Sequence, residues 1–324
     1  MSSPGSRTAV RHAKIFSRIT ADVWLPLVLL FGWLAVASTT QAAALGRGEC
    51  RSVPSKILGH AVPYCVILPP SYDSGNQRYP ILYFLHGLGS NAQLLVNEGG
   101  MDLINDLWSQ NKIREFLIVT PDADRSFYIN SRDGKVRYED FFIREFIPYI
   151  ESHYRVRTDR QSRGISGVSM GGYGSLRLAL RHAQLFGSVS AHSAAVVANL
   201  PSGGMTGYQG AMLSRVLGTA FGSPPDPAYW KQNSPFTIVS RDLITRAEVS
   251  PVAHATGLQI YFDCGTEDEY GFNVGAQAFH DLLDARHIPN EFHLYPGGHD
   301  WSYVAEHFPA SLEFHSRAFR LVVK

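Results

Sequence analysis

The sequence predicts an α/β fold in which a mainly parallel central sheet carries helices on both faces. Residues 80–85 and 115–120 are continuous apolar runs, which are typical of strands buried on both faces. Residues 137–153 carry apolar side chains at helical spacing, and helical segments alternate with strand patterns along the chain. This alternation indicates a parallel sheet, because each helix returns the chain to the edge where the next strand begins.

The predicted elements follow in chain order. Residues 62–68 alternate in polarity up to two prolines, and the first strand or two are expected to pair antiparallel at the sheet edge. The further strands are expected at 80–85, 115–120, 163–168, 186–191, 258–264 and 291–295, and the helices at 137–153, 272–286 and 301–322.

Residues 193–250 lack strong strand signals and are rich in Gly, Pro and Ser. We interpret them as an insertion that covers or shapes the functional site, with short helices near 208–219 and 227–232. The remainder of residues 45–324 is expected to form one domain.

The first 44 residues have the layout of a secretory signal peptide. Four basic residues precede the 15-residue apolar run 23–37, and small residues follow it. Cleavage is expected after Ala42 or Ala44, although Ala37 also satisfies the rule of small residues. The alternative is an uncleaved anchor, but a transmembrane helix needs about 20 apolar residues. The mature protein is therefore predicted to be secreted or periplasmic, without a stable membrane anchor.

Composition excludes several functional classes. The chain has 324 residues, a formal net charge of +1 and 45% hydrophobic residues, which suits a globular protein with a large core. No basic stripe suggests a nucleic-acid partner.

Of the three cysteines, Cys264 falls in an apolar strand and is expected to be a buried thiol. A tight turn at 58–60 would place Cys65 opposite about position 54, so a bridge to Cys50 needs a bulge or a longer loop.

Residues 163–180 show the clearest chemical motif. Gly167-Val168-Ser169-Met170-Gly171 lies between a predicted strand and a predicted helix, which is the layout of a nucleophile elbow. The strained turn needs neighbours without side chains, and Gly167 and Gly171 meet that need. The alternative is a glycine-rich turn that happens to contain a serine. The strand-turn-helix context favours Ser169 as a nucleophile.

A serine nucleophile needs a base and a carboxylate that orients the base. His299 follows the last predicted strand in a glycine-rich turn, at the sheet edge where ligands bind. Asp268 lies in the loop after the strand 258–264 and is the predicted acid. Glu267 and Asp263 remain alternatives, although Asp263 falls in or at the end of the strand.

An oxyanion requires preorganised N–H donors. We expect one from Met170, the residue after the nucleophile, and the other from Leu88 in the loop after the strand 80–85. His86 begins that loop and is interpreted as orienting it. No metal is predicted, because the histidines lack ligand spacing, and no cofactor is predicted, because no phosphate-binding loop is present.

At these motifs the sequence resembles the esterase-D family of α/β hydrolases, which includes feruloyl and acetylxylan esterases, S-formylglutathione hydrolases and antigen 85 mycolyltransferases. The resemblance covers residues 62–319 and rests on residues 68–73, 84–87, 121–122, 166–174, 265–268 and 297–301. It implies the α/β-hydrolase fold with Ser169 as nucleophile, Asp268 as acid and His299 as base. It also implies a substrate pocket, for which the candidates are His86, Ser126, Tyr128 and Trp301.

The resulting prediction is an exported serine carboxylic-ester hydrolase that acts through an acyl-enzyme. Its partner would be a small-molecule or carbohydrate-linked ester. An acyltransferase of the antigen 85 type with the same triad is the first alternative, and a non-catalytic binding protein on a hydrolase fold is the second. Export argues against S-formylglutathione hydrolase activity, because those family members are cytosolic.

Overall fold

The computed structural model describes residues 45–197, 207–241 and 257–319. The predicted signal peptide, part of the predicted insertion and the end of the last predicted helix lie outside these ranges. None of the described helices is long and apolar enough to cross a membrane.

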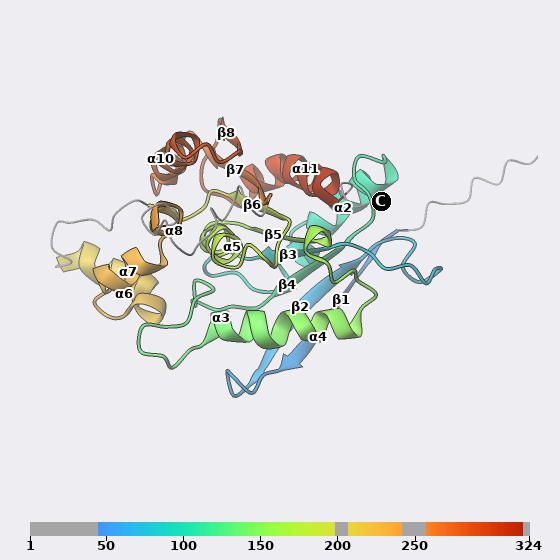
Figure 1. The fold of residues 1–324 in the computed structure, drawn as a ribbon, viewed down its shortest axis with the longest axis horizontal. Helices are drawn as coiled ribbons and strands as arrows, with labels where there is room; N and C mark the ends of the chain where they lie inside the picture. Colours follow the sequence, from blue (N-terminus) through green and yellow to red (C-terminus); the bar gives the residue numbers. More distant parts are fainter. Residues whose placement is uncertain (1–44, 198–206, 242–256, 320–324) are drawn as a thin grey trace, which may run out of the picture. The chain divides into compact units, whose positions relative to one another are not determined.

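Eight strands form one sheet in the order β1-β2-β4-β3-β5-β6-β7-β8 (Figure 1). β1 pairs antiparallel with β2, and β2 pairs antiparallel with β4, whereas all other neighbours are parallel. The predicted mainly parallel sheet with an antiparallel edge is confirmed. The strands are β1 (Arg47–Pro54), β2 (Ala61–Leu68), β3 (Ile81–Leu85), β4 (Leu117–Pro121), β5 (Arg163–Gly167), β6 (Ser188–His192), β7 (Gln259–Gly265) and β8 (Glu291–Tyr295).

Side chains of the apolar strands pack into two separate hydrophobic clusters, one on each face of the sheet. In β3, Ile81, Tyr83 and Leu85 join one hydrophobic cluster. Leu82 and Phe84 join the other cluster on the opposite face of the sheet. Successive side chains of a strand point to opposite faces, so a continuous apolar run is needed wherever both faces are covered.

Helices cover both faces of the sheet, as predicted. α2 (Gly100–Ser109) and α11 (Trp301–Ala318) supply the smaller cluster on one face. α5 (Met170–Arg181) and the segment 138–153 supply the larger cluster on the other. Figure 1 shows α2 and α11 at the upper right and the segment 138–153 at the bottom, with strands between them. α10 (Phe272–Ala285) packs through Phe279 into the larger cluster. Two short elements are α1 (Leu94–Asn97) and η2 (Arg160–Ser162).

The predicted helix 137–153 is present as three consecutive parts. They are α3 (Tyr138–Phe141), the π-helical turn η1 (Phe142–Phe146) and α4 (Ile147–His153). Phe142 and Phe146 are fully buried and stack with ring centroids 5.7 Å apart. The apolar stripe therefore faces the sheet, as its periodicity indicates.

The first hairpin has the longer loop that a bridge between Cys50 and Cys65 requires. Cys65 pairs with Cys50, and the two form a disulfide. Strand pairing stops at Pro54 and Ala61, so the connection is a wide loop rather than a tight turn. The carboxylate of Glu145 in η1 accepts hydrogen bonds from the Ser55 hydroxyl at 2.5 Å and from loop N–H groups. Tertiary contacts thus satisfy the loop, and the sequence near the turn does not reveal them.

The described part of the predicted insertion contains three helices: α6 (Gly207–Phe221), α7 (Pro227–Asn233) and α8 (Pro235–Arg241). The first two match the predicted short helices, and the third was not predicted. Trp230 of α7 stacks on Tyr173 of α5 with ring centroids 5.7 Å apart. Phe236 of α8 packs against Phe279 of α10. These helices are anchored to the flanks of α5 and α10, and a covering role for the insertion stays a prediction.

A network of buried hydrogen bonds and ion pairs connects the insertion to α5. Arg177 of α5, only 1% exposed, donates to Glu139 at 2.8 Å and to Asn233 of α7 at 2.6 Å. Burial alone would raise the pKa of Glu139, but hydrogen bonds and charges from His182 and Arg177 outweigh burial and lower it to about 2. A buried charge is tolerated here because each partner is hydrogen-bonded.

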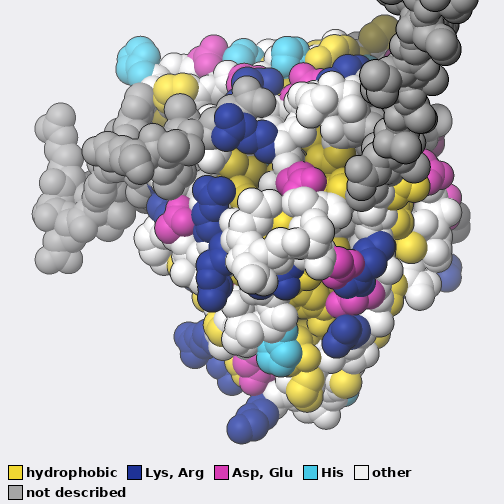
Figure 2. All heavy atoms as spheres, turned by 90° about the vertical axis from the view of Figure 1, so that its right-hand side faces the viewer, with side chains coloured by type: hydrophobic (Ala, Val, Ile, Leu, Met, Phe, Trp, Pro, Cys, Tyr) yellow, Lys and Arg dark blue, Asp and Glu magenta, His cyan; other side chains and the backbone are white. Residues whose placement is uncertain are grey.

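Charged side chains on the surface are mixed in sign. On the face shown in Figure 2, basic and acidic side chains are interspersed with apolar and uncharged ones. Arg47, for example, is paired with Asp73 at 2.7 Å. Such pairs contribute little stability individually.

Candidate active site

Ser169 lies at the tip of a sharp turn between β5 and α5. Its φ is 56° and its ψ is −114°, a conformation that a residue other than glycine rarely adopts. A Cβ at Gly171 would lie 1.9 Å from the carbonyl oxygen of Leu85, and one at Gly167 would lie 2.3 Å from that of Gly171. Both positions therefore require glycine, which explains the glycines two residues on either side of Ser169.

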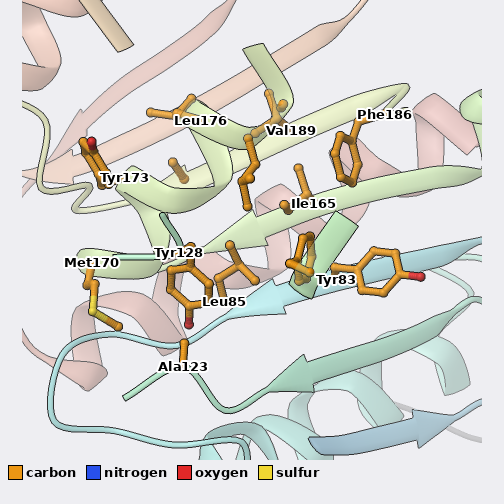
Figure 3. Close-up of a cluster of buried hydrophobic side chains, with 14 of the residues drawn as sticks. Tyr83, Leu85, Ala123, Tyr128, Ile165, Met170, Tyr173, Leu176, Phe186 and Val189 are labelled. Carbon is orange, nitrogen blue, oxygen red and sulfur yellow. The ribbon is translucent and has the colours of Figure 1, made fainter. Parts of the chain in front are cut away.

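The strained turn is held by hydrogen bonds and by a packed core. The Ser169 N–H donates to the carbonyl of His192 at 2.9 Å, and the Ser169 carbonyl accepts from Ala195 at 3.0 Å. Figure 3 shows part of the larger hydrophobic cluster, which includes Met170 and Tyr173 of α5 and Leu85 of β3. A strained backbone persists only when its surroundings over-determine it, and here the neighbouring strands and α5 do so.

His299 connects Ser169 to Asp268. Its Nδ1 is 2.7 Å from Oδ2 of Asp268, and its Nε2 is 2.9 Å from Oγ of Ser169. Because a carboxylate only accepts, Nδ1 carries the proton in the neutral imidazole and Nε2 is free to accept the serine proton. A Cβ at Gly265 would lie 2.2 Å from the carbonyl oxygen of Gly297, so close packing of the β7 and β8 loops brings these residues together.

The carboxylate of Asp268 is buried, and both of its oxygens have hydrogen-bond partners. Its Oδ1 accepts from the N–H groups of Tyr270 at 3.0 Å and Phe272 at 3.3 Å, and the thiol of Cys264 lies 3.5 Å from Oδ2. Burial favours a raised pKa, but the hydrogen bond and charge of His299, with the two backbone donors, outweigh it and leave the pKa of Asp268 below its ordinary value. Asp268 is thus held as the charged partner of His299.

The other two candidate acids lie elsewhere. Asp263 lies inside β7, where its Oδ1 accepts from the hydroxyl of Tyr303 at 3.0 Å and its Oδ2 lies 2.9 Å from Nδ1 of His192. Glu267 is exposed in the loop. The structure therefore brings Asp268, and neither of these, to His299.

The loop after β3 lies directly beside Ser169. A Cβ at Gly87 would be 3.5 Å from Cβ of Ser169. Nδ1 of the buried His86 donates to the Gly87 carbonyl at 2.8 Å, while Nε2 accepts from the Ala123 N–H at 3.0 Å. In a trans peptide the carbonyl and the following N–H point in opposite directions, so the Leu88 N–H points away from His86. His86 orients the loop through these two hydrogen bonds.

Met170 begins α5, so its N–H is one of the first helical donors that have no partner within the helix. The positive end of the helix dipole also lies at this terminus. Both features suit stabilisation of a negative oxygen. The assignment of Met170 and Leu88 as oxyanion donors stays a prediction.

The remaining candidate pocket residues have other contacts. Tyr128 is fully buried, and its hydroxyl donates to the His86 carbonyl at 3.0 Å. Ser126 is also buried, and its hydroxyl accepts from the Tyr128 N–H. The indole N–H of Trp301 donates to the Glu98 carbonyl at 2.7 Å, which ties α11 to the segment before α2. A role for these residues in binding substrate stays a prediction.

Two residues that sequence reasoning missed flank His299. Tyr270 and Phe272 meet its ring edge-on, with centroids 4.8 Å and 5.3 Å away. The signal available in the sequence was their position, two and four residues after the predicted acid. Across the described ranges, no group of His, Cys, Asp or Glu is placed to hold a metal ion.

The fold and this geometry define a serine hydrolase of the α/β-hydrolase class, with a hydroxyl, an imidazole and a carboxylate in one hydrogen-bonded chain. Comparison with known families supports the same class. The chain belongs to the family described as Putative esterase, which matches residues 55–315.

Several relatives are named as esterases. An esterase from Mycobacterium tuberculosis is 28% identical over 248 residues, covering 72% of this chain and 51% of that protein. This chain therefore spans about half the length of that relative. An acetyl esterase from Caldicellulosiruptor saccharolyticus is 25% identical over 252 residues, covering 76% of this chain and 86% of that protein. A solved ferulic acid esterase is 29% identical with a TM-score of 0.69, covering 85% of this chain and 99% of that one.

Proposed function

We propose that this protein is an exported esterase that hydrolyses carboxylic esters through an acyl-enzyme on Ser169. The observation that carries the proposal is the continuous chain from Ser169 Oγ to His299 to Asp268, at 2.9 Å and 2.7 Å. A weak hydroxyl nucleophile gains a base in this way, and the carboxylate holds that base in the required tautomer.

The reaction follows from the positions of these groups. Nε2 of His299 takes the Ser169 proton as Oγ attacks the ester carbonyl, and the N–H groups of Leu88 and Met170 bind the oxyanion. The protonated His299 then donates to the leaving alcohol, which departs. Water deprotonated by His299 attacks the acyl-enzyme and releases the acid, which restores Ser169.

The acid is proposed to be aromatic or short, as in ferulate and acetate esters. The ferulic acid esterase and the acetyl esterase among the relatives support this choice. A panel of acetyl, feruloyl and long-chain esters tests it, with the highest kcat/KM expected for one of the first two. Preference for the long-chain ester would contradict the proposed acid.

The same assay separates hydrolysis from acyl transfer. Acyl transfer to added glucose or trehalose that outruns hydrolysis would replace the proposal by an acyltransferase. Absence of turnover on every ester in the panel would instead favour a binding protein.

Export is proposed from the composition of residues 1–44, and the disulfide Cys50–Cys65 supports an oxidising compartment. The intact mass of the protein recovered from the periplasm or medium is expected to lack the signal peptide. A mass that retains residues 1–37 would contradict cleavage.

A further inference from the structure

Two exposed apolar side chains lie in the segment that follows Asp268. Among the described residues, four large hydrophobic side chains are exposed, and Tyr270 at 63% and Val274 at 71% are two of them. Tyr270 lies in the loop between β7 and α10, and Val274 follows on the first turn of α10. Of the two, Tyr270 contacts His299 directly, so its exposed ring is available to a ligand at the site.

Tyr270 is held in place rather than free to move with its loop. Its N–H donates to Oδ1 of Asp268 at 3.0 Å. Its ring stacks on that of Phe272 with centroids 5.6 Å apart, and it meets the imidazole of His299 edge-on at 4.8 Å. The aromatic ring therefore has a defined position beside the proposed base.

The proposed reaction determines which half of an ester lies near His299. Nε2 donates its proton to the oxygen of the leaving alcohol, so that oxygen must come within hydrogen-bonding distance of Nε2. The carbonyl oxygen must instead lie at the donors of the loop after β3 and the start of α5. The atoms attached to the alcohol oxygen consequently extend over the residues that flank His299, and Tyr270 is one of these.

The charges of this loop limit the kind of alcohol. Glu267 and Glu269 are exposed on either side of Asp268. Oε2 of Glu269 accepts from the backbone N–H of His299 at 2.8 Å, so this carboxylate lies next to the residue that supplies the base. Like charges repel, which disfavours an anionic leaving group. An aromatic face beside carboxylates can bind either an uncharged ring, through its apolar face and its hydroxyls, or a cation.

We propose that Tyr270 is a specificity-determining residue that binds the alcohol half of the ester, and that this alcohol is an uncharged ring compound. Phe272 stacks on one face of the Tyr270 ring, while Tyr270 stays largely exposed, so a ligand meets a single aromatic face. A single face suits the flat apolar side of an uncharged ring, whereas ammonium groups are typically enclosed by several aromatic rings. This inference rests on the proposed esterase function and adds the identity of the group that leaves.

The test uses esters of one acid with different alcohols, so that the acyl half is constant. The wild type, Tyr270→Ala and Tyr270→Phe are compared on the methyl ester, the 6-O-ester of methyl glucoside and the choline ester. Tyr270→Ala is expected to lower kcat/KM for the glucoside ester about 5- to 10-fold more than kcat/KM for the methyl ester, mainly through KM. Tyr270→Phe is expected to match the wild type on both esters.

Controls separate a subsite from other roles. Leu294→Ala removes a different exposed hydrophobic side chain, 38% exposed in β8, and is expected to leave KM for both esters unchanged. Tyr270→Leu keeps apolar bulk without an aromatic face, and an intermediate KM for the glucoside ester is expected.

Three outcomes would overturn the inference. They are an equal loss of kcat on the methyl and glucoside esters, a change in KM that follows the acid rather than the alcohol, and a lower wild-type KM for the choline ester than for the glucoside ester. Failure of the wild type to hydrolyse even the methyl ester would contradict the proposed function itself.

Discussion

Ser169→Ala is expected to abolish ester hydrolysis and leave the fold intact. The hydroxyl is the atom to which His299 Nε2 is aligned at 2.9 Å, and no acyl-enzyme can form without it. Removal of a serine nucleophile that acts as a unit with its histidine lowers kcat by about 10⁴-fold or more. Steady-state hydrolysis of p-nitrophenyl esters measures the loss, and circular dichroism checks the fold.

Covalent labelling identifies the nucleophile independently. A fluorophosphonate is expected to label the wild type at Ser169 and not the variant. Ser74→Ala, which changes an exposed serine, serves as the matched control and should be labelled like the wild type. Full activity of Ser169→Ala, or a label on another serine, would exclude the proposed mechanism.

Asp268→Asn is expected to lower kcat by about 10³- to 10⁴-fold with little change in shape. Asparagine retains an oxygen for the N–H groups of Tyr270 and Phe272, which now bond Oδ1 at 3.0 Å and 3.3 Å. Its amide N–H₂ then faces Nδ1 of His299 and favours the tautomer with the proton on Nε2. That tautomer cannot accept the Ser169 proton.

Glu267→Gln provides the matched control, because it neutralises an exposed carboxylate in the same loop and should retain wild-type kcat. A larger loss of kcat in Glu267→Gln than in Asp268→Asn would reverse the assignment of the acid.

Comparing the wild type with Asp268→Asn also tests how Asp268 affects the stability of the fold. Because the folded pKa of Asp268 lies below its ordinary value of 3.8, its charge stabilises the fold above that pH and the contribution is lost as pH falls through the folded pKa. The difference in free energy of unfolding between wild type and Asp268→Asn should therefore shrink at acidic pH.

Several features of the fold could be predicted because they depend on short stretches of chain. The two-sided burial of β3 needs a continuous apolar run, and residues 80–85 show one. The helix 138–153 follows from its aromatic spacing. The short α1 and the helix α2 were not predicted, since neither was recognised as a distinct apolar pattern beside the stronger strands.

Other features depend on contacts between distant residues. Glu145 holds the hairpin loop and thereby allows Cys50 to lie opposite Cys65, although a tight turn would exclude that pairing. The position of Tyr128 also depends on such a contact, because a Cβ at Gly174 of α5 would lie 2.6 Å from the Tyr128 ring, whose hydroxyl donates to the His86 carbonyl.

The sequence by itself determined the parallel sheet, the strained serine turn and the order of serine, acid and histidine along the chain. Each of these depends on local backbone sterics or on the period of apolar residues. Only the tertiary structure decided that His299 meets Asp268 rather than Asp263 or Glu267, and that Tyr270 lies beside the base. Those choices depend on how closely the β7 and β8 loops pack through Gly265 and Gly297, and such a through-space contact has no local pattern in the chain.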